Sequence, residues 1–180
     1  PRPNRIRNDT AMVSEPAFPN PHAVVVHFPV ALLLTATLLD LACLVARRAI
    51  WLDRAATTLY VLGTVAAGAA FLTGDAASEE LWDIPDAARS ALASHENLAL
   101  ITLVAFAVIT ALRLLVSHLG RKDKRTAVGF FRLLTLGAAL AAQLLLVTTA
   151  HLGGSLVYRH AVAVGSTQAS PADPVDELEP

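Results

Sequence analysis

The segment HENLALITLVAFAVITALRLLVS, residues 95–117, has the composition of a membrane-spanning helix. Its only formally charged residues are Glu96 near its start and Arg113 near its end. A helix rises about 1.5 Å per residue, so this segment is long enough to cross roughly 30 Å of hydrocarbon. It predicts the third of four transmembrane helices.

Three other segments have the same apolar character. The first is expected over residues 21–46, because Asn20 can cap a helix and Pro21 is tolerated at its first position. The second and fourth are expected over residues 55–73 and 128–158. The composition of the whole chain supports this interpretation. Of its residues, 54% are hydrophobic and only 16% are charged, which is too apolar for a soluble protein of this length. The sequence therefore predicts an all-α fold, a four-helix transmembrane bundle that runs up, down, up and down.

The bundle is expected to occupy residues 20–164, between two tails. Residues 1–19 and 165–180 have too few apolar side chains to form a core, which predicts disorder. Within the first helix, Pro29 removes a backbone hydrogen bond, and we expect a bend just beyond His27. The second helix is rich in small residues, which favours close packing against another helix over a slot for a ligand.

Lys and Arg residues are distributed unevenly between the two ends of the bundle. Of the fourteen in the chain, nine fall at one end and five at the other. The nine are Arg47, Arg48, Arg54, Arg113, Arg121, Lys122, Lys124, Arg125 and Arg132. Cytoplasmic segments of membrane proteins carry an excess of these residues. We therefore expect a multi-pass protein of the bacterial inner membrane with both termini outside the cytoplasm.

Most of the histidines are expected at one face of the membrane. An alternating bundle brings the start of the first helix, the end of the second, the start of the third and the end of the fourth together. The histidines at these ends are His22, His27, His95, His151 and His160. His118 alone is expected at the opposite face. An ionisable side chain at membrane depth is costly unless it is paired or ligated, so this group predicts a functional site.

Several imidazoles without accompanying thiols favour haem b as the cofactor. Cys43 is the only cysteine, which excludes an intramolecular disulfide, a cysteine-based zinc site and covalent CxxCH attachment of haem. A b-type haem takes two axial nitrogens from different helices, and small residues make room for it. Our order of preference for the ligands is His27 and His95 first, His151 and His160 next, and His22 last.

Two alternatives to haem stay open. A copper or zinc site would also use His27 and His95 first. Three imidazoles suffice for such a site, and Asp75 can add an oxygen. In the other alternative the histidines simply lie at the membrane interface, which neutral imidazole tolerates well. The protein would then be a structural or partner-binding subunit without a cofactor.

A few polar residues within the spans also need an interpretation. Asp40 is expected to pair with Arg113 or Arg132 as a structural salt bridge, which we favour over a proton path. Gln143 is expected to form hydrogen bonds across the bundle. The sequence contains no nucleophile with a neighbouring base, no P-loop and no carboxylate pair at catalytic spacing, so we expect no independent catalysis.

These features together predict an integral membrane subunit that binds haem b and serves electron transfer. Its surroundings would be the lipid bilayer, with other subunits of a membrane redox complex or a periplasmic electron carrier as partners. A formal net charge of −1 gives no reason to expect nucleic acid as a partner.

Three stretches of the chain resemble the DUF2231 family of bacterial membrane proteins. They are HAVVVHFPVALLL (His22–Leu34), His95 with Asn97 and Leu98, and GGSLVYRHAVAV (Gly153–Val164). The resemblance covers residues 22–164 and includes every candidate histidine except His151. Where the family pattern has a proline after the first histidine and two glycines near the end, this chain has Ala23, Ala161 and Ala163. The resemblance implies a four-span protein, and it implies no particular activity.

Overall fold

The computed structural model describes residues 21–46, 49–79, 84–119, 125–160 and 162. Every regular element within these residues is a helix. The helices are α1 (Pro21–Val25), α2 (His27–Val45), α3 (Ile50–Glu79), α4 (Asp86–Leu119) and α5 (Arg125–His160). The prediction of an all-α fold is confirmed, while the tails expected at residues 1–19 and 165–180 lie outside the described residues.

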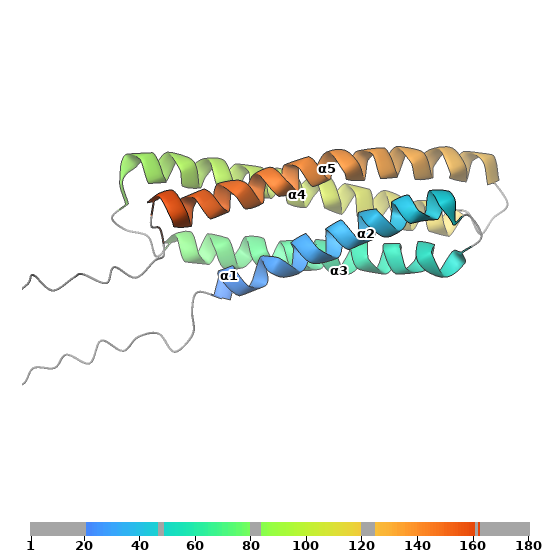
Figure 1. Ribbon diagram of the computed structural model, residues 1–180, viewed down its shortest axis with the longest axis horizontal. Coiled ribbons are helices and arrows are strands. Elements are labelled where there is room, and N and C mark those ends of the chain that lie inside the picture. Colours follow the sequence, from blue (N-terminus) through green and yellow to red (C-terminus); the bar gives the residue numbers. More distant parts are fainter. Residues whose placement is uncertain (1–20, 47–48, 80–83, 120–124, 161, 163–180) are drawn as a thin grey trace, which may run out of the picture.

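The helices are arranged as four antiparallel rods (Figure 1). α1 and α2 follow each other as one span, and α3, α4 and α5 then alternate in direction. α2 packs along α3, and α4 packs along α5, so the bundle consists of two helical hairpins, joined by contacts of α3 with α4 and of α2 with α5. α1, the end of α3, the start of α4 and the end of α5 lie at the same end of the bundle. We call this end the α1 end.

The surface of the bundle has the character of a membrane protein. Four segments are long and apolar enough to cross a membrane, with mean hydropathies between 1.6 and 2.5. Large apolar side chains point outward along the whole length, for example Val65, which is 67% exposed, and Leu144, which is 72% exposed. Apolar surface of this extent requires lipid as its solvent. The chain is therefore an integral, multi-pass membrane protein.

The core lies in the middle of the bundle and receives side chains from all four spans. Its buried members are Leu33, Ala36, Tyr60, Phe106, Ile109, Ala139, Ala142 and Leu146. Gly63 of α3 allows α2 to come close, because a Cβ at this position would lie 2.7 Å from the side chain of Leu33. At this level the small residues of α3 serve helix packing, as predicted.

The first span is interrupted at Val26, between α1 and α2. This corrects the expected bend, which was placed just beyond His27. Pro29 has no N–H to donate to the carbonyl of Val25, and its ring crowds that carbonyl, so the helix opens at this level. The interruption is mild, since the N–H of Val26 still donates to the carbonyl of His22 at 3.0 Å.

α3 and α4 extend beyond the segments expected from hydropathy. α3 runs from Ile50 to Glu79, and α4 already begins at Asp86. The first residues of α4 are rich in alanine and follow Pro85, which favours a helix start there. His95 consequently lies well within a continuous helix, with helical residues before and after it.

Candidate functional site

His22 of α1 is held against the end of α3. Its Nδ1 lies 2.9 Å from the carbonyl oxygen of Ala70 and 3.3 Å from Oγ1 of Thr73. The imidazole packs on Gly74, where an added Cβ would lie 2.8 Å from Cε1 of the ring. Because a carbonyl can only accept, Nδ1 donates its hydrogen, and Nε2 is the nitrogen that carries the lone pair.

His95 of α4 is held against α5 in the same way. Its Nδ1 lies 3.1 Å from the carbonyl oxygen of Thr149. The imidazole packs on Gly153, where an added Cβ would lie 3.0 Å from Cε1 of the ring. The same argument makes Nδ1 the donor and Nε2 the nitrogen with the lone pair.

The two histidines thus occupy equivalent places in the two hairpins. In each, the accepting carbonyl and the supporting glycine are four residues apart on one helix face: Ala70 and Gly74 on α3, Thr149 and Gly153 on α5. Both histidines lie at the α1 end (Figure 1) and are half-buried. We call His22 and His95 the histidine pair.

A further contact fixes the backbone that supports His95. Oγ1 of Thr149 lies 3.0 Å from Oγ1 of Thr102, which is buried on α4. This contact lies two helical turns along α4 from His95 and holds α5 at the level of the accepting carbonyl. The orientation of the imidazole is therefore set by two contacts between α4 and α5.

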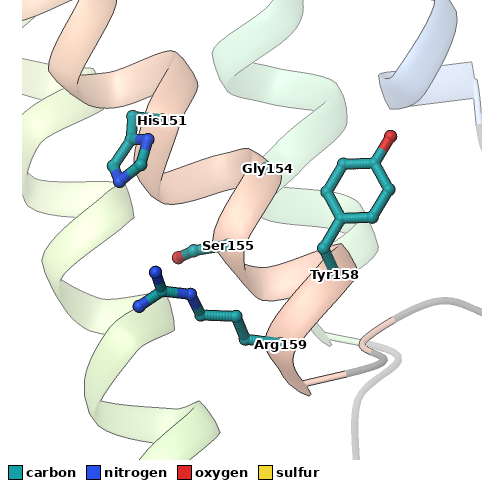
Figure 2. Close-up of a pocket in the computed structure, with 5 residues that line it drawn as sticks. All are labelled: His151, Gly154, Ser155, Tyr158 and Arg159. Atoms are coloured by element: carbon teal, nitrogen blue, oxygen red, sulfur yellow. The ribbon is translucent and has the colours of Figure 1, made fainter.

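The other candidate histidines are not part of the pair. His27 is exposed at the start of α2, and within the described residues it has no hydrogen bond or ion pair. His151 is exposed and lines a pocket on α5 (Figure 2). His160 is the last residue of α5 and is partly buried, whereas His118 is exposed at the opposite end. Of the candidate histidines, His22 and His95 thus share one kind of contact with a neighbouring helix, in which the ring meets a backbone carbonyl and a glycine.

The preference for His27 over His22 was based on depth and on the family resemblance, and the structure adds the direction of the side chains. Five helical residues correspond to a rotation of about 140°, so the two histidines point in clearly different directions. His22 is directed at α3, and His27 is exposed. The signals that identify the pair are Gly74 and Gly153, which the sequence shows only as two of several small residues.

The described residues also bear on the copper or zinc alternative. Among them, no three residues of the types His, Cys, Asp and Glu are placed to hold one metal ion. Asp75, which was considered as an additional oxygen ligand, is exposed. A site with two imidazoles is consistent with this arrangement, whereas a site with three or more protein ligands has no counterpart in the described ranges.

A second polar cluster lies in the half of the bundle away from the α1 end. Arg113 of α4 pairs with Asp40 of α2 and, at 3.1 Å, with Asp53 of α3. Arg132 of α5 pairs with Asp53 at 2.6 Å. The predicted partnership of Asp40 with Arg113 is confirmed, and Arg132 binds a different carboxylate. The guanidinium of Arg113 also lies 5.3 Å from the ring centroid of Tyr60.

Gln143 connects two spans in the middle of the bundle, as predicted. Its Nε2 donates to the carbonyl of Leu33 at 3.0 Å and to Oγ1 of Thr37 at 2.7 Å. Oγ1 of Thr37 lies 3.1 Å from the hydroxyl of Tyr60. Every buried side-chain nitrogen and oxygen of the described residues has a partner. This network is therefore a satisfied structural one and offers no open ligand position.

Comparison with known proteins identifies one family. A family model described as "Predicted membrane protein (DUF2231)" matches residues 19–166. Neither the comparison with curated proteins nor that with solved structures found a match. The matched range includes all four spans, the histidine pair and both supporting glycines.

Proposed function

The chain belongs to the DUF2231 family of predicted membrane proteins, and we propose that this member binds haem b through His22 and His95 and carries electrons at the α1 end of the bundle. The observation that carries the proposal is the shared geometry of the two imidazoles. Each donates its Nδ1 hydrogen to a backbone carbonyl and keeps the lone pair on Nε2.

This geometry is typical of histidines that bind metals. A ligating imidazole usually donates its other ring hydrogen to a carbonyl or carboxylate, which fixes the tautomer and makes the ligating nitrogen more basic. His22 of α1 and His95 of α4 would hold a b-type haem, each through its Nε2. The two hairpins supply one ligand each, and their glycines allow each ring to lie directly on the neighbouring helix.

The haem and the protein would make different contributions to electron transfer. Bound haem would supply a one-electron couple, and the protein would supply the two ligands, their orientation and an environment of low polarity. Both imidazoles are half-buried, and large apolar side chains surround the bundle. Such an environment limits the access of water to the metal and favours electron transfer over reactions with solvent.

A purely structural role of the histidine pair is the strongest competing function. Each imidazole links two helices by a hydrogen bond that spans about fifty residues of sequence, which by itself stabilises the α1 end. The copper or zinc alternative has less support, because it requires a third protein ligand near the pair. The test must therefore distinguish a ligating role of the two histidines from a purely structural one.

Substitution of either histidine by glutamine distinguishes these two roles. In His22→Gln and His95→Gln, the side-chain amide can still donate to the carbonyl of Ala70 or Thr149, but it is a poor iron ligand. We expect wild-type protein, purified in detergent after expression with ample haem, to show a sharp alpha band when reduced with dithionite. Both variants should lose this band and remain folded by size-exclusion chromatography.

His27→Gln and His118→Gln are the controls, because neither histidine belongs to the pair. Both should retain the wild-type spectrum. If wild-type protein shows no Soret band, or if His27→Gln removes it and His22→Gln does not, the assignment of the pair as haem ligands is wrong.

We also propose that the α1 end faces the periplasm of the bacterial inner membrane. The support is the distribution of Lys and Arg, with nine of fourteen at the opposite end. In this orientation the histidine pair lies on the outer side of the membrane. Its partners would be a periplasmic one-electron carrier or another subunit of a membrane redox complex.

A further inference from the structure

A shallow pocket of about 280 Å³ lies on α5, separate from the histidine pair (Figure 2). It is lined by His151, Gly154, Ser155, Tyr158 and Arg159. The volume is below that of pockets that enclose a complete small-molecule ligand. The pocket is thus of a size for one polar group of a larger molecule.

Three polar side chains share one side of this pocket. His151, Ser155 and Arg159 follow each other at intervals of four residues, which places them on one helix face. Figure 2 shows the imidazole, the hydroxyl and the guanidinium on one side of the α5 ribbon, while the phenol of Tyr158 points to the other side. The three polar groups therefore line the same space.

The charge of this space is positive and not neutralised by the described residues. Among them, Arg159 has no hydrogen bond and no ion pair. A planar guanidinium offers two parallel N–H donors that match the oxygens of a phosphate. A ring nitrogen of His151 can add a further hydrogen bond, whereas the hydroxyl of Ser155 donates to the carbonyl of Leu152 at 2.8 Å. The donor set favours an anionic group with several oxygens.

The same helix face becomes apolar deeper in the membrane. Val147, Leu144 and Leu140 continue the line of His151 toward the middle of α5, and they are 64%, 72% and 46% exposed. From His151 to Arg159 the helix rises about 12 Å, which spans the headgroup layer and the edge of the hydrocarbon. A molecule that follows this face needs an anionic head and an apolar tail.

We propose that this face of α5 binds a phospholipid of the surrounding membrane, with the phosphate in the pocket and an acyl chain along Val147, Leu144 and Leu140. The charge of Arg159 selects for the phosphate, and the exposed apolar line accommodates the tail. Tyr158 is exposed near the end of the fourth span, and tyrosine is common at such positions in membrane proteins. The site is independent of haem and of the histidine pair.

The test is native mass spectrometry of the full chain in detergent, titrated with dioleoyl phosphatidylglycerol or with dioleoylglycerol, which has the same chains and no phosphate. We expect wild-type protein to retain the phosphatidylglycerol and not the dioleoylglycerol. Arg159→Gln should weaken retention about tenfold, as expected for the loss of a charge-assisted hydrogen bond. Arg89→Gln is the control, because Arg89 is exposed at the same end and lines no part of the pocket.

A second variant tests whether the pocket must be open for the lipid to bind. A Cβ at Gly154 would meet no atom within 4 Å, and Gly154 lines the pocket, so we expect the side chain in Gly154→Leu to occupy part of this space. It should weaken retention as strongly as Arg159→Gln. Equal retention of the two lipids, equal effects of Arg159→Gln and Arg89→Gln, or displacement of the lipid by an excess of inorganic phosphate would each overturn the proposal.

Discussion

The imidazole of His95 lies directly on Gly153, so that a Cβ at this glycine would be 3.0 Å from Cε1 of the ring. His22 has the same relation to Gly74, at 2.8 Å. In both cases the contact joins the two spans of one hairpin near the α1 end. The absence of a side chain at these glycines is therefore what allows the carbonyl of the same helix to hold Nδ1 of the ring.

Gly153→Ala should displace His95 from the carbonyl of Thr149. The new methyl group forces the ring or α5 to move, which costs on the order of 1–3 kcal/mol of stability despite the better helix propensity of alanine. Denaturation in detergent should show lower stability, and any haem band should shift or weaken. Gly154→Ala is the control, because its Cβ meets no neighbour and its stability should not fall. Equal behaviour of the two variants would contradict the contact.

Arg113 should matter more for stability than Asp40. Removal of Asp40 leaves Arg113 with Asp53, whereas removal of Arg113 leaves the buried carboxylate of Asp40 without a cation. We expect Arg113→Ala to lower the free energy of unfolding by about 3–5 kcal/mol and Asp40→Ala by less. The measurement is unfolding in a mixture of detergent and sodium dodecyl sulfate.

The double variant tests whether the two residues act on each other. Because they are in contact, the cost of Asp40→Ala with Arg113→Ala should be smaller than the sum of the single costs. Arg54→Ala, which removes an exposed cation at the same end, should have little effect. Strict additivity of the two single costs would show that the pair contributes no coupling energy.

The orientation of the bundle can be tested by cysteine labelling. In a Cys43→Ala background, Ala87→Cys at the start of α4 should react with a membrane-impermeant maleimide in cells with a permeabilised outer membrane. Ala46→Cys, which lies between α2 and α3, should react only after lysis. Both positions are exposed, so a difference in labelling reports the side of the membrane. The reverse pattern would place the α1 end in the cytoplasm.

The spans and the ion pair of Asp40 with Arg113 were predictable from the sequence. Long apolar segments have few alternatives to membrane helices, and a charge within such a segment requires a partner at the same depth. In an antiparallel bundle, depth follows from the position along each span, so Arg113 was among the partners identified. The same reasoning placed Gln143 in the middle of the bundle.

Which histidines contact a neighbouring helix was not predictable from depth alone. His22 and His27 lie close together in sequence, and only the direction of each side chain separates a ring that contacts α3 from one that is exposed. This direction depends on how α1 packs and on the interruption at Val26. An almost uniformly apolar segment gives little information about rotation, because its lipid-facing and protein-facing sides have similar residues.

The most direct test of the central proposal is the haem content of the purified protein, measured as the pyridine haemochrome after expression with ample haem. Wild-type protein should contain one haem b per chain, as should His27→Gln. The double variant His22→Gln with His95→Gln should contain none while it remains folded. A folded wild-type protein without haem, or a double variant that retains it, would contradict the assignment of His22 and His95 as a haem-binding pair.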